Sequence, residues 1–325
     1  MKKTQKKLKQ MTNRRGVIRK RLATIGGVGI ISLVLVSIIY FNISASNKDK
    51  EIINTTHKVE VNEKERDETV VNNKTPLEDQ KVEEVEDNIL YLSLEADKYA
   101  VDAKLVEEKL KSWNYVREDN KKIAYLTFDD GPSKTVTPEI LDVLRANDVK
   151  ATFFVLGSTI EENKTHDILK DMIKDGHAIG NHGYSHRYDI LYPNRKVDVQ
   201  AFMNDIEKNE ELLKSILGEN FYTRVLRFPG GHNSWDTEAI DPILEKEGYV
   251  YIDWNTLNGD SESSSEKTVN ELVNRLKETV SDIHGNNDEV VVLMHDKDGK
   301  EATAEALQEI IDYLKAEGYE FRTLK

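Results

Sequence analysis

From residue 122 onward, short apolar runs alternate with longer amphipathic runs. The short runs have the length of strands, and the longer runs repeat apolar residues with the spacing of one helix face. The predicted strands are residues 123–128, 151–156, 177–182, 225–229, 249–254, 289–294 and 319–324. The predicted helices are residues 138–146, 167–174, 198–217, 237–247, 269–283 and 302–316.

This alternation predicts an α/β fold, in which helices cover a parallel sheet. Seven strands favour a closed or nearly closed (β/α) barrel, one strand short of the eightfold form. An open, doubly wound sheet is the alternative.

A further apolar run lies near the start of the chain. Residues 23–41 contain no charged residue and are about long enough to cross a bilayer core. Residues 1–22 contain ten Lys or Arg and no acid, and such basic flanks stay in the cytoplasm. We therefore predict a basic cytoplasmic tail, a transmembrane signal anchor at residues 23–43, and a remainder outside the cytoplasm that faces the cell wall. A cleavable signal peptide is the rival interpretation, but its apolar core is usually shorter.

Residues 44–120 predict a charged extracytoplasmic linker before a catalytic domain at 121–325. Residues 47–87 have too few apolar side chains to form a core. Residues 88–118 are more apolar and include a helical stretch near 102–113, which predicts a small cap or a partly ordered stalk.

The charge and the cysteine content exclude some functions. Beyond residues 1–22 the chain has 36 basic against 59 acidic residues, a net charge of −23, which disfavours binding to nucleic acid. The chain has no cysteine, so the outer part folds without disulfides, as suits a bacterial cell-surface enzyme. The sequence indicates no protein partner.

Ionisable residues gather where the predicted strands end. In a parallel barrel these ends share one face, where active sites form. The polar segments are TFDDGP (127–132), NHGYSH (181–186), RFPGG (227–231), DWNTLNGD (253–260) and LMHD (293–296).

Two histidines and a carboxylate are a common ligand set for zinc and similar divalent metals. Asp129 or Asp130, with His182 and His186, supplies that set. Neither pair alone indicates a metal site. Histidines four residues apart also occur on exposed helices and loops, and adjacent aspartates often cap helices or form turns.

The five segments together resemble, in order and spacing, the motifs of the polysaccharide deacetylase family, also called the NodB-homology or carbohydrate esterase 4 family. The resemblance covers residues 121–325 and leaves the N-terminal third unexplained. It implies a distorted (β/α)7 barrel and a metal-dependent hydrolase that removes acetyl groups from a glycan.

The resemblance also implies a role for each residue. Asp129 is the general base that takes a proton from a metal-activated water, and His295 is the general acid. The metal ligands are Asp130, His182 and His186, with Zn²⁺ favoured over Co²⁺ or another transition metal.

Three further roles follow from the resemblance. Arg227 pairs with Asp129, the backbone N–H of Gly230 stabilises the developing oxyanion, and Asp260 hydrogen-bonds the general acid. Many family members have a DxxDW-like segment where this chain has DWNTLNGDS, so Asp253 or Asp260 can fill the last role; the spacing favours Asp260.

The substrate pocket is less well specified. Tyr192, Trp254 and Leu293 are candidates to line it, with core packing as the alternative. The remaining histidines are predicted to be solvated or packed, and His232 is the first of them to check as a substrate contact.

The predicted substrate is an N-acetylated cell-surface glycan, with N-acetylglucosamine of peptidoglycan favoured because the tether places the domain beside the wall. Another N-acetylglucosamine polymer, N-acetylmuramic acid, or an O-acetylated xylan are the alternatives. A glycan-binding module without activity is a more remote one.

Overall fold

The central sheet consists of parallel strands. The computed structural model describes residues 94–112, 117–263, 265–283 and 288–325. Within these ranges, eight strands form one sheet in the order β6-β5-β4-β3-β2-β8-β7, and β9 pairs with β2 beside this path. The strands are β2 (Lys122–Asp129), β3 (Thr152–Val155), β4 (Ala178–Asn181), β5 (Val225–Leu226), β6 (Val250–Tyr251), β7 (Thr256–Leu257), β8 (Glu289–His295) and β9 (Tyr319–Phe321).

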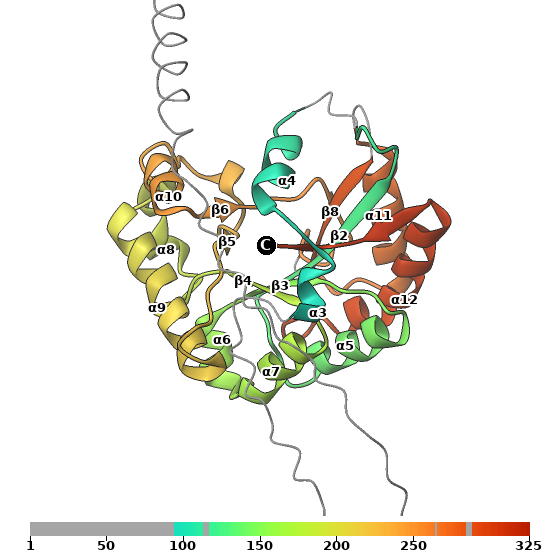
Figure 1. The fold of residues 1–325 in the computed structure, drawn as a ribbon, viewed down its shortest axis with the longest axis horizontal. Helices are drawn as coiled ribbons and strands as arrows, with labels where there is room; N and C mark the ends of the chain where they lie inside the picture. The colour runs from blue at the N-terminus through green and yellow to red at the C-terminus, as the bar shows by residue number, and fades with distance from the viewer. Residues whose placement is uncertain (1–93, 113–116, 264, 284–287) are drawn as a thin grey trace, which may run out of the picture. The chain divides into compact units, whose positions relative to one another are not determined.

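The sheet curls into a nearly closed barrel (Figure 1). β8 pairs with β2 from Ile123↔Glu289 to Asp129↔His295. In the described part of the chain no strand pairing joins the two edge strands, β6 and β7, so the barrel is not fully closed. Asn255 accounts for this gap: its side-chain amide bonds the backbone of Val291 and Glu289 at 2.8 and 2.9 Å and directs the chain toward β8.

The path around the barrel has seven strands, as predicted, but one of them differs from the prediction. The predicted strand at residues 319–324 is divided into β9 and β10 (Thr323–Leu324), and β10 pairs with β1 (Ala100–Val101). The seventh place on the path belongs to β7. A strand of two residues is too short to show an alternating pattern, which is why the sequence did not predict it.

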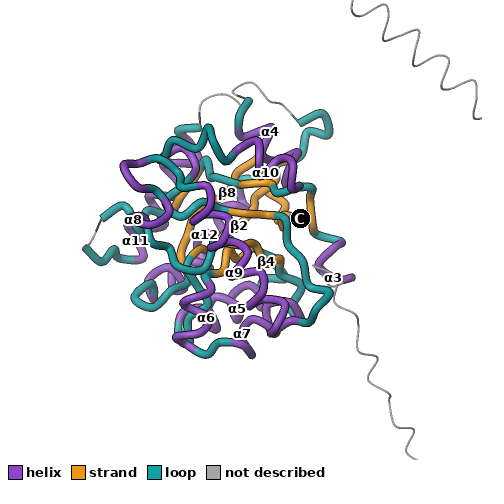
Figure 2. The backbone as a smooth tube through the Cα atoms, turned by 90° about the vertical axis from the view of Figure 1, so that its left-hand side faces the viewer, coloured by secondary structure: helices purple, strands orange, loops and turns teal. Residues whose placement is uncertain are grey.

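Helices surround the sheet, as the two perpendicular views show (Figures 1 and 2). The six predicted helices are all present, and α11 begins with a capping box between Thr268 and Glu271. Two short helices, α6 and α8, were not predicted. The helices around the sheet are α5 (Val136–Ala146), α6 (Gly157–Asn163), α7 (His166–Lys174), α8 (Tyr188–Leu191), α9 (Val199–Leu217), α10 (Asp241–Glu247), α11 (Val269–Ser281) and α12 (Glu301–Ala316).

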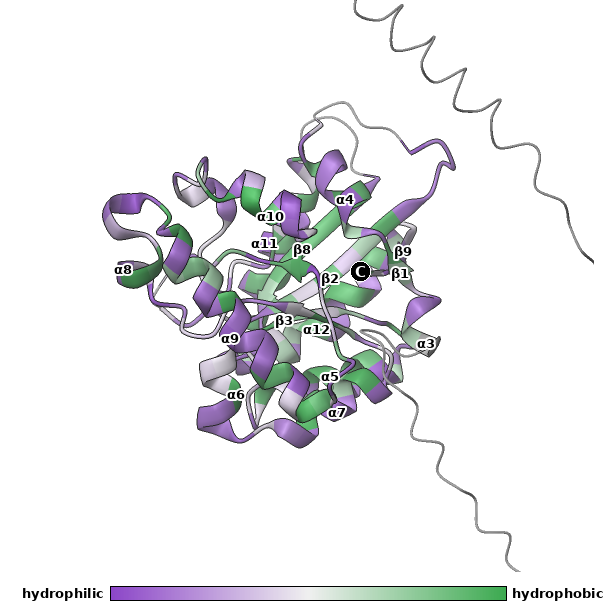
Figure 3. Cartoon of the chain, turned by 60° about the vertical axis from the view of Figure 1, so that its left-hand side comes forward, coloured by the Kyte–Doolittle hydropathy of each residue, from purple (hydrophilic) through white to green (hydrophobic). Residues whose placement is uncertain are grey.

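Alternation along β2, β3 and β8 separates two apolar clusters, and the long central strands are largely hydrophobic (Figure 3). Leu126 of β2 belongs to the cluster under the helices, whereas Ile123 and Tyr125 belong to the cluster inside the barrel. Thr127 and Asp129 continue this inward face toward the carboxyl end of the strand. The barrel interior is therefore apolar at one end and polar at the other.

The segment before the barrel closes its apolar end. A short helix, α3 (Leu94–Asp97), precedes β1, and α4 (Ala103–Leu110) follows it. Asp102 caps α4 by accepting a hydrogen bond from Lys104 N at 2.8 Å. Ala103 and Val106 are fully buried and pack on Tyr125 and other residues of the interior cluster. This part of the predicted linker is thus an ordered cap on the barrel.

The predicted basic tail (residues 1–22) and membrane anchor (residues 23–43) lie outside the described residues, as do residues 44–93 of the predicted linker. Within the described ranges, no helix has both the length and the apolar character that a membrane span requires.

Candidate active site

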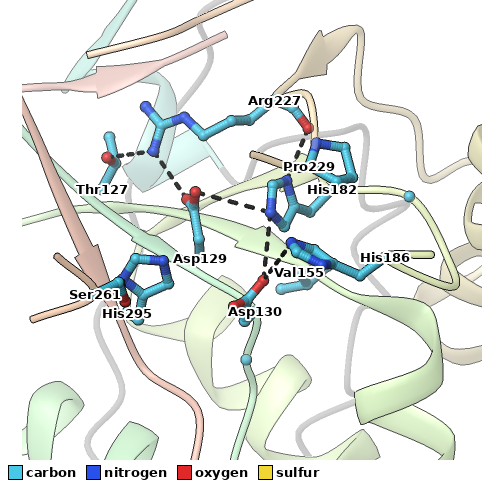
Figure 4. Close-up of polar contacts among 12 residues, drawn as sticks. Thr127, Asp129, Asp130, Val155, His182, His186, Arg227, Pro229, Ser261 and His295 are labelled. Carbon is cyan, nitrogen blue, oxygen red and sulfur yellow. Dashed lines mark hydrogen bonds and ion pairs between the residues drawn. The ribbon is translucent and has the colours of Figure 1, made fainter. Parts of the chain in front are cut away.

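The three predicted metal ligands meet at the carboxyl end of the strands (Figure 4). Asp130 follows β2 directly, and His182 follows β4. Asp130 Oδ1 lies 3.4 Å from Nε2 of His182 and 3.4 Å from Nε2 of His186. The three ligand atoms lie within 4.8 Å of one another, a spacing that suits a shared cation.

Asp130 Oδ1 is the ligand atom that lies between the two histidines. It is buried, and it has no hydrogen-bond partner among the described residues. Burial alone would raise the pKa of Asp130, but the nearby imidazole of His182, followed by that of His186, holds this pKa well below its usual value. An ionised carboxylate oxygen 3.4 Å from two imidazole nitrogens is a donor set that fits a divalent metal.

His182 is oriented for this role by a backbone carbonyl. Its Nδ1 donates to the oxygen of Arg227 at 2.8 Å, which leaves Nε2 to face Asp130. Such outer hydrogen bonds fix the orientation of ligating histidines.

The loop that carries both histidines is held by Asp205 of α9. This carboxylate accepts hydrogen bonds from Tyr184 N at 2.8 Å and Ser185 N at 3.1 Å. Gly183 has a φ of +80°, and a Cβ at this position would lie 2.4 Å from Asp205 Oδ2, so the close approach requires glycine. Asp205 could not be recognised from the sequence, because its position inside a long amphipathic helix is that of an ordinary solvated acid.

The proposed base, Asp129, is held by a buried arginine. Arg227 Nη1 donates to Asp129 Oδ1 at 2.9 Å and to Thr127 Oγ1 at 2.6 Å. Arg227 is 1% exposed and its guanidinium lies 4.1 Å from the ring centre of Phe154. The predicted pairing of Arg227 with Asp129 is present in this geometry, and Thr127 adds an anchor that the sequence did not reveal.

His295 is beside Asp129 in the β2–β8 register and is paired with Asp260. Its Nδ1 lies 2.8 Å from Asp260 Oδ1, and its backbone N–H donates to Oδ2 at 2.9 Å. Asp253 instead accepts a hydrogen bond from His232 N at 3.0 Å. Of the two candidates, Asp260 therefore lies beside His295.

The Asp260 carboxylate determines the protonation of His295. Burial lowers the pKa of His295, but the hydrogen bond and the negative charge of Asp260 outweigh it, so the pKa lies above its ordinary value. A raised pKa favours the protonated imidazole, the form that the predicted general acid requires.

A cavity of about 320 Å³ is lined by six of the predicted site residues, Asp129, Asp130, His182, His186, Asp260 and His295, whereas Arg227 lies behind Asp129 and does not line it. Gly230, Trp254 and Leu293 line it as predicted, but Tyr192 does not. The Tyr192 ring is 3% exposed and stacks on Trp235, with 4.2 Å between the ring centres, because the short helix α8 presents Tyr188 to the cavity instead. The lining also includes Tyr188, Gly231, Leu257, Gly259, Ser261, Glu262 and Lys297, none of which was predicted.

His232 packs beside the cavity without lining it. Its Nε2 lies 2.8 Å from Asp241 Oδ1, and its ring stacks on Tyr251 with 3.9 Å between centres. His232 therefore has the packing role that was predicted for the remaining histidines.

Comparisons with known proteins agree with this geometry. Residues 116–252 match the family model described as polysaccharide deacetylase. The putative polysaccharide deacetylase YheN of Bacillus subtilis is 36% identical over 63% of this chain and 67% of its own length. A peptidoglycan-N-acetylglucosamine deacetylase of Bacillus cereus is 30% identical over 68% of this chain and 96% of its own length.

A solved structure resembles the fold as well. The Streptococcus mutans CE4 esterase is 40% identical and superposes with a TM-score of 0.66 over 72% of this chain and 96% of that one. Sequence identity, coverage and fold agree, so the chain belongs to the polysaccharide deacetylase family and is a hydrolase.

Proposed function

We propose that this enzyme removes N-acetyl groups from N-acetylglucosamine residues of peptidoglycan with the help of a bound divalent metal. The observation that supports the metal-dependent reaction is the buried Oδ1 of Asp130, which lies between His182 and His186 and accepts no hydrogen bond from the described residues. Beside it lie an acid and a base that are each held by a charged partner. The family membership and the names of the relatives support the choice of substrate.

The residues divide the reaction between them. Asp129, fixed by Arg227, accepts the proton of the water that attacks the acetamide carbonyl. The backbone N–H of Gly230, on the cavity wall, is the proposed donor to the oxygen that becomes negative. His295 then gives its proton to the departing amine, which is a poor leaving group without it.

Asp130, His182 and His186 would hold the metal. When bound, it supplies a Lewis acid that polarises the carbonyl and lowers the pKa of a coordinated water. Zn²⁺ is the proposed ion, and Co²⁺ satisfies the same imidazole and carboxylate donors.

The substrate is tested by measuring acetate released from purified peptidoglycan, chitooligosaccharides and acetylxylan, with and without a chelator. We expect release from the N-acetylated substrates and its loss after chelation. Activity confined to acetylxylan would show an esterase instead. Mass analysis of the digested peptidoglycan then distinguishes glucosamine from deacetylated muramic acid.

We also propose that residues 23–43 anchor the enzyme in the cell membrane with the barrel outside the cytoplasm. The apolar run and its basic flank support this placement. Protease added to intact wall-free cells should digest the barrel but spare a marker in the cytoplasm. Protection of the barrel would contradict the proposal.

A further inference from the structure

Lys297 occupies a place in the cavity that the proposed reaction does not use. It lies in the loop between β8 and α12, its side chain is 44% exposed, and its Nζ lies 2.7 Å from Asp130 Oδ2. No other partner of its ammonium group is present in the described ranges.

The two oxygens of Asp130 thus have different surroundings. Oδ1 lies 3.4 Å from Nε2 of His182 and of His186 and accepts no hydrogen bond from the described residues, while Oδ2 is hydrogen-bonded to Lys297. A carboxylate held in this way offers one oxygen to a metal, because the other is already engaged. The hydrogen bond from Lys297 also fixes the direction in which Oδ1 points, as outer hydrogen bonds do for ligating side chains.

The charge of Lys297 has the opposite effect on the metal. Its ammonium group contacts the same carboxylate that the metal would bind, and like charges at such short range repel each other even near the protein surface. Glutamine at this position would keep an N–H donor for Oδ2 but remove the charge. The orienting and the repulsive effects can therefore be separated.

We propose that Lys297 is a positioning residue that keeps Oδ1 of Asp130 available to the metal and, through its charge, weakens the binding of that metal. The inference rests on the proposed function, since it requires a divalent metal at Asp130, His182 and His186. It adds that metal affinity at this site is limited by a residue that is not a ligand.

The test is a titration of the metal-free full chain, in detergent, with Zn²⁺ in competition with a chelating dye. We expect Lys297→Gln to bind Zn²⁺ more tightly than the parent, on the order of tenfold, and Lys297→Arg to bind like the parent. The difference between Lys297→Gln and the parent should shrink as salt is added, because the effect comes from a partly exposed charge.

Lys134→Gln is the matched control, because Lys134 is exposed, lies four residues after Asp130 and changes the net charge equally. It should leave the affinity within about twofold of the parent, since exposed charges without a close partner are screened. An equal gain in both glutamine variants would overturn the proposal, as would unchanged or weaker binding by Lys297→Gln. If the parent binds no Zn²⁺, the proposed metal site, and with it the proposed function, is contradicted. If the parent binds Zn²⁺ but the Lys297 variants do not show the expected affinities, only the role of Lys297 is contradicted.

Discussion

Both ends of the barrel contain a buried acidic residue, but the partners of the two acids differ. At the amino ends of the strands, Glu289 is 7% exposed and is paired with Lys109 at 2.8 Å and with the hydroxyl of Tyr125 at 2.6 Å. At the carboxyl ends, Asp130 is 5% exposed; its Oδ2 is paired with Lys297 at 2.7 Å, and its Oδ1 lies 3.4 Å from Nε2 of both His182 and His186. The acid at the amino ends is thus surrounded by cations and a hydroxyl, whereas the acid at the carboxyl ends also faces two imidazoles at a spacing that fits a divalent metal.

This contrast separates charge that serves stability from charge that serves chemistry. A buried ion is costly unless it is paired and hydrogen-bonded, so an incomplete set persists only where a ligand completes it. We expect changes at the carboxyl ends to alter activity more than stability, and changes at the amino ends to do the reverse.

The largest effect should follow removal of a ligand. In His182→Ala we expect both bound metal and deacetylation to fall to background. Mutation of a residue that only hydrogen-bonds a metal ligand typically lowers metal affinity or activity about 10- to 100-fold, and loss of a ligand itself has a larger effect. Metal content and acetate release measure this. His166→Ala, an exposed histidine at the start of α7, is the control and should behave like the parent. If His182→Ala retained metal and activity, the carboxyl ends of the strands would not be the site of the chemistry, and the contrast between the two ends of the barrel would be wrong.

Replacement of the base should be nearly as severe but should spare the metal. Asp129→Asn keeps the shape of the side chain and loses the proton acceptor, so we expect kcat to fall by about 10²- to 10⁴-fold with unchanged metal content. Parallel assays of kcat and bound Zn²⁺ check this. Loss of the metal would mean that Asp129 is a ligand, contrary to the assignment of Asp130.

A smaller effect is expected in the pH profile of Asp260→Asn. His295 must be protonated to act as an acid, so activity falls as the pH rises through its pKa. Asp260 holds that pKa above the ordinary value, and its neutralisation should shift the alkaline fall to lower pH. Each unit of this shift lowers the rate about tenfold on the alkaline side.

Asp253→Asn is the control for this profile, because Asp253 bonds to His232 and Asn233 rather than to His295. Its alkaline fall should coincide with that of the parent. A shift in Asp253→Asn alone would reverse the assignment of the two aspartates.

The smallest effect on activity should come from the opposite end. Glu289→Gln removes the acid that is paired with Lys109 at 2.8 Å and with Arg117 at 3.4 Å, although Arg117 keeps its ion pair with Asp119. We expect the free energy of unfolding to fall by about 1–3 kcal/mol with kcat unchanged below the unfolding temperature. Urea unfolding measures the loss. Glu305→Gln, an exposed acid on α12, should not reproduce it. A fall in kcat without a fall in stability would remove the distinction between the ends.

The sequence predicted the parts of the site that lie at or just after the carboxyl ends of the predicted strands. Asp129, His182 and His295 follow from the inward alternation of strands whose positions the apolar runs reveal. The family motifs then assigned a role to each of these residues.

The parts that the sequence missed depend on short elements and loops. Tyr188 rather than Tyr192 reaches the cavity because a helix of four residues turns the chain there, and no periodic pattern identifies so short a helix. Lys297 and Asp205 act through contacts with residues 167 and 20 or 21 positions away in the chain. Only the fold reveals such distant pairs.

The pairing of β1 with β10 has a mechanical consequence. Tension applied at Leu94 meets α3 and the ion pair of Asp97 with Lys325 first, and then this strand pair and α4, at the amino ends of the barrel strands. To reach β2, the pull must break the hydrogen bonds of Thr323 and Lys325 to the β1 segment and extract Val106 from the core. The proposed catalytic groups lie at the opposite end of those strands. Tension on the segment before β1 must therefore break these contacts before it can distort the site.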